Sequence, residues 1–268
     1  MSRLTAQSLR VQLVHASAKV YAKGWVANHD GNLTARSGPG RIVATPTAMS
    51  KGDVTENDLI VVNDQGEQVS GRLKSFTEMA LHLAVYERRK DVQAVIHAHP
   101  PYATAMAVAG FGLERPIIAE AVVSLGDRVP LVPFALPKTE AWRAGVADHC
   151  ERYDALMLQN HGVITWGDSL EQAFLRMELV EHLATITHHS MAFGGPRFLD
   201  EAHLAPLLDA RRKAGLGPEA RGLSAPQPPA RPPLNVPRPA AAPLAGAGGI
   251  DTERLVAVIL EELARLER

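Results

Sequence analysis

The sequence predicts a layered domain of the α/β or α+β class, on three observations. From residue 40 to about residue 190, short apolar runs alternate with stretches of helical periodicity. The chain has 268 residues, of which 46% are hydrophobic and 21% charged, enough for a substantial buried core. After about residue 222 the composition changes abruptly, so we expect the domain to span residues 1–222. Periodicity alone leaves open whether the sheet is parallel or antiparallel.

Charge and cysteine content exclude several classes of protein. Lys and Arg number 28 and Asp and Glu 29, a net charge of -1 that provides no basic face for nucleic acid. The single cysteine, Cys150, excludes a disulfide framework and a cysteine-built zinc site. No segment approaches the roughly 18 apolar residues that cross a bilayer, and the N-terminus lacks an apolar signal core. We therefore expect a cytoplasmic protein with neither a nucleic-acid nor a membrane partner.

The elements follow from the spacing of apolar residues. Leu9, Leu13, Val14 and Val20 recur at helical spacing and predict an opening helix, followed by a turn at residues 28–32. The strand-like runs are 41–45, 59–63, 92–99, 117–123, 129–134 and 155–159. The helix-like runs are 76–89, 102–109, 139–151 and 169–191.

Three histidines lie where two of these strands end. His97 and His99 close the run 92–99, and alternation along a strand places both side chains on one face, where two imidazoles can ligate one metal ion. His161 follows the strand 155–159 and can supply a third ligand. Catalytic zinc sites keep three protein ligands and one open position. The alternative for each histidine is an ordinary polar residue at a strand end or in a loop.

Two other local patterns have both a structural and a functional interpretation. Ser75-Phe76-Thr77-Glu78 reads as a helix capping box, or it places the Glu78 carboxylate at the metal while Ser75 or Thr77 caps the helix. The segments 31–36 and 45–51 combine turn amides, hydroxyls and a lysine, which suit an anion such as phosphate. Ordinary turn chemistry is the alternative for both segments.

Five blocks, in this order, resemble the class II aldolase/adducin family: GNLTAR, TPTAMSKGD, SFTEMALHLAVY, AVIHAHP and LQNHGVITWG. The resemblance covers about residues 5–195 and is nearest to the L-fuculose-1-phosphate aldolase branch. It implies a three-layer α/β/α fold around a largely antiparallel sheet. It also implies a homotetramer with active sites at subunit interfaces.

The resemblance further implies a metal centre and its chemistry. Zinc, or another divalent metal, would be held by His97, His99 and His161, with Glu78 as the catalytic acid/base. The reaction would be cleavage of L-fuculose or L-rhamnulose 1-phosphate to dihydroxyacetone phosphate and L-lactaldehyde. Zinc would stabilise the negative charge left on the three-carbon fragment, and Glu78 would carry its C3 proton. A sugar-phosphate 4-epimerase, a sugar-acid phosphate decarboxylase and a methylthioribulose-phosphate dehydratase are alternatives with a similar site. A non-catalytic adducin-like binding module is another, which the retained histidines and Glu78 disfavour.

Substrate contacts carry over from the family with three departures. The phosphate-binding residues map onto Asn32, Thr47 and Thr77. Ala48 stands where a glycine is typical of the phosphate loop, and Phe76 where many members carry serine. Glu120 aligns with a tyrosine that acts near the aldehyde, so it becomes the candidate aldehyde-side residue.

The C-terminal part of the chain has a different composition. Residues 223–249 hold eight of the nineteen prolines and predict a disordered linker. Residues 250–268 predict an amphipathic helix with Leu255, Ile259 and Leu263 on one stripe. A linker and one such helix resemble an encapsulation peptide, which implies a shell protein as partner and a location inside a bacterial microcompartment. Docking onto its own domain, self-association as a coiled coil and binding to a membrane surface are the alternatives.

Overall fold

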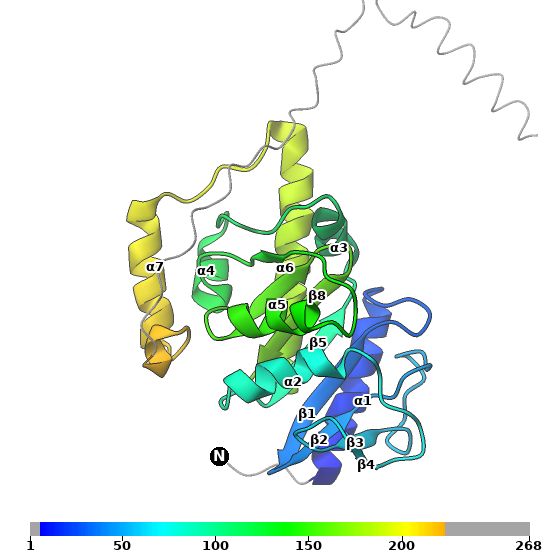
Figure 1. The fold of residues 1–268 in the computed structure, drawn as a ribbon. Coiled ribbons are helices and arrows are strands. Elements are labelled where there is room, and N and C mark those ends of the chain that lie inside the picture. The colour runs from blue at the N-terminus through cyan, green and yellow to red at the C-terminus, as the bar shows by residue number, and fades with distance from the viewer. Residues whose placement is uncertain (1–5, 223–268) are drawn as a thin grey trace, which may run out of the picture. The chain divides into compact units, whose positions relative to one another are not determined.

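The computed structural model describes residues 6–222, and an eight-stranded sheet lies at their centre (Figure 1). The strand order is β4-β3-β2-β1-β5-β8-β7-β6. Neighbouring strands are antiparallel except for β6 and β7, which are parallel. The strands are β1 (Asn32–Gly38), β2 (Arg41–Ala44), β3 (Ile60–Val62), β4 (Gln68–Ser70), β5 (Ala94–Ala98), β6 (Leu131–Val132), β7 (Ala155–Leu158) and β8 (Gly162–Gly167). The expected α/β class with a largely antiparallel sheet is confirmed.

Helices cover both faces of the sheet and make three layers (Figure 1). One buried apolar cluster joins the sheet to α1 (Ala6–Ala22), α3 (Pro101–Val108), α4 (Ala119–Leu125) and α6 (Leu170–Ser190). A second cluster, on the opposite face, joins it to α2 (Met79–Arg88) and α5 (Glu140–Cys150). The remaining helix α7 (Glu201–Lys213) packs on α4, and single 3-10 turns form η1 (Met191–Phe193) and η2 (Glu219–Arg221).

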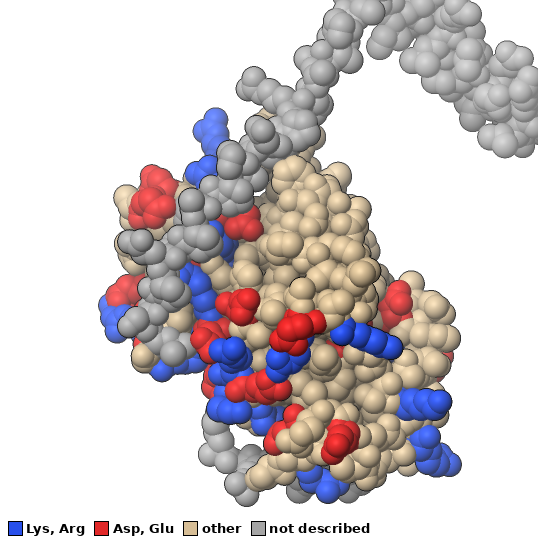
Figure 2. Space-filling model, viewed as in Figure 1, with Lys and Arg blue, Asp and Glu red and all other residues tan. Residues whose placement is uncertain are grey.

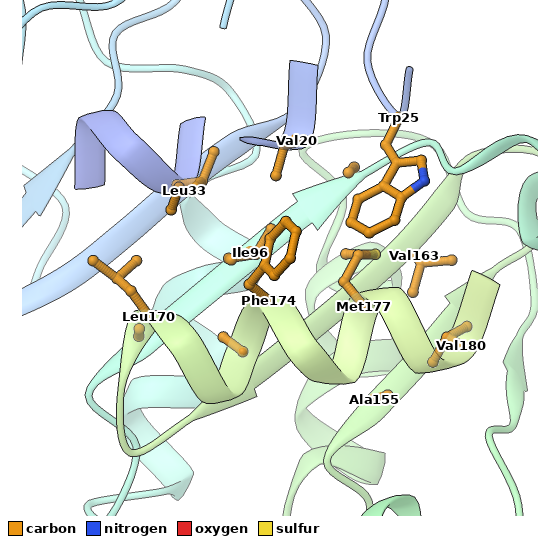
Figure 3. Close-up of a cluster of buried hydrophobic side chains, with 14 of the residues drawn as sticks. Val20, Trp25, Leu33, Ile96, Ala155, Val163, Leu170, Phe174, Met177 and Val180 are labelled. Carbon is orange, nitrogen blue, oxygen red and sulfur yellow. The ribbon is translucent and has the colours of Figure 1, made fainter. Parts of the chain in front are cut away.

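Alternation along β5 decides which side chains reach each layer. Ile96 joins the cluster under α6, where Phe174 and Met177 pack against the strands (Figure 3). Val95 belongs to the opposite cluster, under α2. His97 therefore points to the α2 side of the sheet, because side chains two residues apart share a face. In the register, His97 lies between Asn32 of β1 and Ile164 of β8, so this end of three adjacent strands can form one site.

The structure bears out most of the expected elements and corrects one. The opening helix and the helices expected at 76–89, 102–109, 139–151 and 169–191 are present as α1, α2, α3, α5 and α6. The strand expected at 117–123 is wrong, because residues 119–125 form α4. Ala121, Val122 and Leu125 are buried there at helical spacing, and packing against α6 and α7 outweighs the β propensity of the valines. Strands β4 and β8 and helix α7 were not expected.

The linker expected at 223–249 and the helix expected at 250–268 lie outside the described residues. Within residues 6–222, no helix is both long and apolar enough to span a bilayer. Acidic and basic side chains stand side by side on the face that Figure 2 shows.

Candidate metal centre

The structure brings His97, His99 and His161 together at one end of the central strands. Their ligand nitrogens all lie within 4.8 Å of one another. The Nε2 atoms of His97 and His99 are 3.1 Å apart, and the ring centroids of His97 and His161 are 4.6 Å apart. His97 is fully buried, whereas His99 and His161 keep 26% and 21% of their side chains exposed. The cluster is therefore anchored in the sheet and open on one side.

Neighbouring groups orient these imidazoles. His97 Nδ1 donates to the Val163 carbonyl at 2.9 Å, which leaves the Nε2 lone pair facing the cluster. His99 Nδ1 lies 3.6 Å from a carboxylate oxygen of Asp30. Burial lowers the pKa of both His97 and His99, which favours the neutral form that binds metal. Three neutral imidazoles suit zinc and several other divalent ions, so the donor set fits a resident metal.

A glycine behind the histidines sets how closely they approach. Gly162 begins β8, and a Cβ built there would stand 2.5 Å from His99 Cδ2 and 2.5 Å from the Ala98 carbonyl oxygen. Contacts under 3.0 Å force something to shift. Only the missing side chain of Gly162 lets the loop of His161 lie against the strand of His97 and His99.

Glu78 lies against the histidine cluster. Its Oε1 is 2.7 Å from His161 Nε2, and its Oε2 is 3.6 Å from His97 Nε2. Asn32 Nδ2 donates to Oε2 at 2.5 Å. Burial alone would raise the pKa of this carboxyl, but His97, His161 and Asn32 together hold that pKa well below its ordinary value. Glu78 is thus an ionised carboxylate beside the cluster, in the position that an acid/base group needs.

The capping box expected at Ser75–Glu78 does not form. Helix α2 begins at Met79, its N-cap is Glu78, and no side chain makes a cap hydrogen bond there. The Glu78 carboxylate is engaged by Asn32 and His161 instead of reaching back to the Ser75 amide. The functional interpretation of this glutamate is the one that the geometry favours.

The expected phosphate residues differ in exposure and in their contact with Glu78. Asn32 is buried and its amide contacts Glu78, whereas Thr47 and Thr77 are exposed. The Thr47 amide donates to the Lys74 carbonyl at 2.9 Å, which joins the loop after β2 to the segment before α2. Ala48, where the family favours glycine, keeps a left-handed φ of 56°. The roles of these residues toward phosphate stay predictions.

Lys51 organises two loops of the site from inside. Its side chain is buried, and Nζ donates to the Met49 carbonyl at 2.7 Å and to the His29 carbonyl at 3.1 Å. Burial lowers the pKa of Lys51 to about 8, although Asp30 and Glu78 favour its charged form. The lysine therefore joins the expected anion loop to the segment that carries Asp30.

Glu120 is not brought to the cluster. It lies in the first turn of α4 with an exposed side chain, and it makes no hydrogen bond or ion pair within residues 6–222. Its aldehyde-side role stays a prediction.

A cavity of about 150 Å³ opens beside His161, and Phe134, Trp142 and Leu158 are among its apolar lining residues.

Sequence reasoning missed the groups that support the cluster. His82, expected to be an unremarkable helical histidine, is fully buried and contacts Asn32. Its place one helical turn after Glu78 was the available signal. The contacts of Asp30 with His99 and of Val163 with His97 depend on strand order and left no local signal.

Comparison with known proteins places this geometry in a family. Residues 11–188 match the family described as Class II Aldolase and Adducin N-terminal domain. The chain is 26% identical to 5-deoxy-D-ribulose 1-phosphate aldolase of Bacillus thuringiensis, over 79% of this chain and 98% of that protein. It is 31% identical to 3-oxo-tetronate 4-phosphate decarboxylase of Escherichia coli K12, over 67% and 86%. A solved structure of L-fuculose 1-phosphate aldolase superposes with a TM-score of 0.70 at 25% identity, over 78% of this chain and 98% of that one.

Proposed function

Because this chain belongs to the class II aldolase and adducin family, whose members are metal-dependent lyases, we propose that it is a zinc-dependent aldolase. Its substrate in this proposal is a ketose 1-phosphate such as L-fuculose or L-rhamnulose 1-phosphate, cleaved to dihydroxyacetone phosphate and L-lactaldehyde. The observation that carries the proposal is the convergence of His97, His99 and His161 on one point with the Glu78 carboxylate beside them.

In this proposal, metal binding and proton transfer are carried out by different residues. His97, His99 and His161 would hold the metal, which when bound supplies a Lewis acid for the negative charge of the three-carbon fragment. When the bond between C3 and C4 breaks, its electron pair stays on C3. Glu78, whose resting carboxylate is ionised, takes up a proton from water and delivers that proton to C3. In the direction of synthesis, Glu78 removes the same proton. The proton of the C4 hydroxyl leaves to a second group, for which Glu120 is the candidate carried over from the family.

Two parts of the site suit the two ends of such a substrate. The loop that holds Thr47 is exposed, and the buried Lys51 ammonium lies behind it with a positive charge for a phosphate. The cavity beside His161 is lined mainly by apolar residues, including Phe134 and Trp142, which suits a deoxy sugar that ends in a methyl group. An anion held by local loops also agrees with a chain of near-zero net charge.

Decarboxylation is the second candidate reaction. The likeness at 31% identity to 3-oxo-tetronate 4-phosphate decarboxylase favours it. Loss of carbon dioxide from a 3-oxo acid also leaves an electron pair on carbon next to a carbonyl. The same histidines and Glu78 would serve it.

Metal analysis followed by a substrate screen tests the proposal. The metal content of the purified protein is measured, and L-fuculose, L-rhamnulose and 5-deoxy-D-ribulose 1-phosphates are assayed for release of dihydroxyacetone phosphate. 3-Oxo-tetronate 4-phosphate is assayed for release of carbon dioxide in parallel. We expect zinc and dihydroxyacetone phosphate from at least one ketose. Metal-loaded protein that releases only carbon dioxide would establish the decarboxylase instead.

A further inference from the structure

A buried chain of hydrogen bonds runs from Glu78 into the interior between α2 and β1. Asn32 Nδ2 contacts Glu78 Oε2 at 2.5 Å, and Asn32 Oδ1 lies 2.6 Å from His82 Nε2. His82 Nδ1 lies 2.8 Å from the Thr34 hydroxyl, which is 2.9 Å from the Tyr86 hydroxyl. Asn32, Thr34, His82 and Tyr86 are at most 3% exposed. The chain is therefore shielded from bulk solvent along its length.

The direction of every bond in this chain follows from its end at Glu78. Asn32 Nδ2 donates to Glu78 Oε2, which leaves the amide oxygen Oδ1 facing His82. Asn32 Oδ1 then accepts, so His82 must carry its proton on Nε2. Burial lowers the pKa of His82 to about 3, so the imidazole is neutral and its Nδ1 accepts from Thr34. Thr34 in turn accepts from the Tyr86 hydroxyl.

We propose that His82 is a positioning residue that acts through Asn32 to hold the Glu78 carboxylate against the histidine cluster. An asparagine amide can rotate and exchange its oxygen and nitrogen, and the exchanged form would turn an oxygen toward the carboxylate. The Nε2–H group of His82 prevents this exchange, because in the exchanged form the Asn32 amide nitrogen and His82 Nε2 would be two donors facing each other. This role deepens the proposed function, since it concerns the group assigned there to carry the C3 proton.

Phe76 closes this chain from one side. Its ring meets the His82 ring edge to face, with centroids 5.3 Å apart, and its own side chain is buried. This phenyl ring stands where many family members carry serine. The large side chain at this position thus shields His82 from solvent, which strengthens its hydrogen bond to Asn32.

Two matched substitutions separate positioning from packing. A glutamine side-chain nitrogen reaches the place of histidine Nε2, so His82→Gln keeps a donor for Asn32. Asparagine reaches only the place of Nδ1, so His82→Asn loses that donor. His149→Asn is the control, because the His149 side chain, within residues 6–222, hydrogen-bonds to the Gly145 carbonyl of its own helix and stacks on Tyr153, away from Glu78 and Asn32.

The first measurement needs no substrate. Nitrogen-15 NMR of histidine-labelled wild-type protein near neutral pH, with the His82 signals assigned by their loss in His82→Gln, reads the tautomer. We expect a proton on Nε2 and none on Nδ1. A proton on Nδ1 overturns the proposal whether or not the proposed aldolase activity is found, and bound metal is measured on the same samples to show that the site is intact.

The second measurement follows turnover of the metal-loaded variants. We expect His82→Asn and Asn32→Ala each to lower kcat about 100-fold with metal content retained, and His82→Gln to restore most of that loss. The double variant His82→Asn/Asn32→Ala should be no slower than Asn32→Ala, since His82 acts through Asn32. If the kcat losses of the two single variants multiply in the double variant, His82 has a packing role only. The same conclusion follows if His82→Gln and His82→Asn lose kcat equally and in step with their melting temperatures.

Discussion

At the scale of single residues, Glu78 is the group on which the contacts of the site converge. One carboxylate oxygen faces His161 and the other faces both His97 and the Asn32 amide. A carboxylate so placed can exchange a proton with a substrate carbon while the histidines hold a metal. Ligation and proton transfer are therefore assigned to different residues, and substitution can separate them.

The first prediction separates the two roles. His97→Ala should lose metal and activity together, because a buried ligand with an oriented Nε2 is removed. Glu78→Gln should keep metal while turnover falls at least about 100-fold, since an amide cannot take the proton. Elemental analysis and turnover on the same preparations check both. A His97→Ala protein that is active without metal would contradict the assignment of the cluster.

The second prediction concerns the space behind the histidines. Gly162→Ala should weaken metal affinity about 10- to 100-fold, because its Cβ would displace the His99 ring or the Ala98 carbonyl. Metal titration against a competing chelator measures the change. Gly38→Ala is the matched control, since a Cβ at this β-strand glycine meets nothing within 4 Å. Equal metal affinity in the two variants would show that Gly162 does not set the histidine geometry.

Single residues differ in how far the sequence alone could predict them. The spacing of His97 and His99 on a strand places both side chains on one face, and the structure brings them together with His161. Glu78 had two interpretations, and only the fold shows its carboxylate turned away from the helix cap. The only local signal for His82 was its place one helical turn after Glu78, because its partners Asn32 and Thr34 are about 50 residues away in the chain.

At the scale of elements, a buried aspartate joins helices from three parts of the fold. Asp154 lies just before β7 and is fully buried. Its carboxylate meets Arg89 after α2 at 2.9 Å, Arg176 of α6 at 3.3 Å and Arg211 of α7 at 2.5 Å. Arg211 also donates to the Val123 and Ser124 carbonyls of α4. This cluster explains how the short helix α7, with little apolar burial of its own, is fixed to the domain.

The third prediction follows from that cluster. Asp154→Asn should lower the free energy of unfolding by about 3–5 kcal/mol, because four guanidinium groups, Arg221 at 3.8 Å among them, lose a buried counter-charge. Urea unfolding measures it. Asp148→Asn, at an exposed aspartate of α5, is the control and should change stability by less than about 1 kcal/mol. A comparable loss of unfolding free energy in both variants would show that the buried Asp154 cluster does not stabilise the fold more than an exposed aspartate does.

The same cluster gives stability a defined dependence on pH. Burial alone would raise the pKa of Asp154, but Arg176, Arg89 and Arg211 lower it from 3.8 to about 2. A folded pKa below the unfolded one means that the contribution is complete above pH 3.8 and is lost as pH falls toward 2. The Asp154→Asn variant should lose less of its remaining stability across this interval than the wild type.

Elements were predictable where a local period was strong and where tertiary packing agreed with it. The apolar period of 169–191 is that of the helix α6, which lies on the sheet. Residues 117–123 hold four β-branched side chains, yet packing against α6 and α7 makes the part from residue 119 onward helical. The order of strands in the sheet cannot be read from such periods. The site forms because β1, β5 and β8 are adjacent in the sheet.

At the scale of the whole molecule, the fourth prediction concerns the residues after 222. The sequence predicts that a proline-rich linker carries an amphipathic helix, residues 250–268, whose apolar stripe needs a partner. We propose that this partner is a microcompartment shell protein. Residues 223–268 fused to a fluorescent reporter should then form puncta in cells that assemble the shell. The control fusion carries lysine at Leu255 and Leu263, and diffuse fluorescence of the native fusion would contradict the proposal.

The central claim is that Glu78, beside a metal held by three histidines, exchanges a proton with C3 of a three-carbon phosphate. The most direct test is proton exchange at C3 of dihydroxyacetone phosphate in deuterium oxide, followed by NMR without any aldehyde. We predict deuterium at C3 with metal-loaded wild type, and exchange at least about 100-fold slower with metal-loaded Glu78→Gln. Exchange at equal rates in the two proteins, or none with the metal-loaded wild type, would contradict the account.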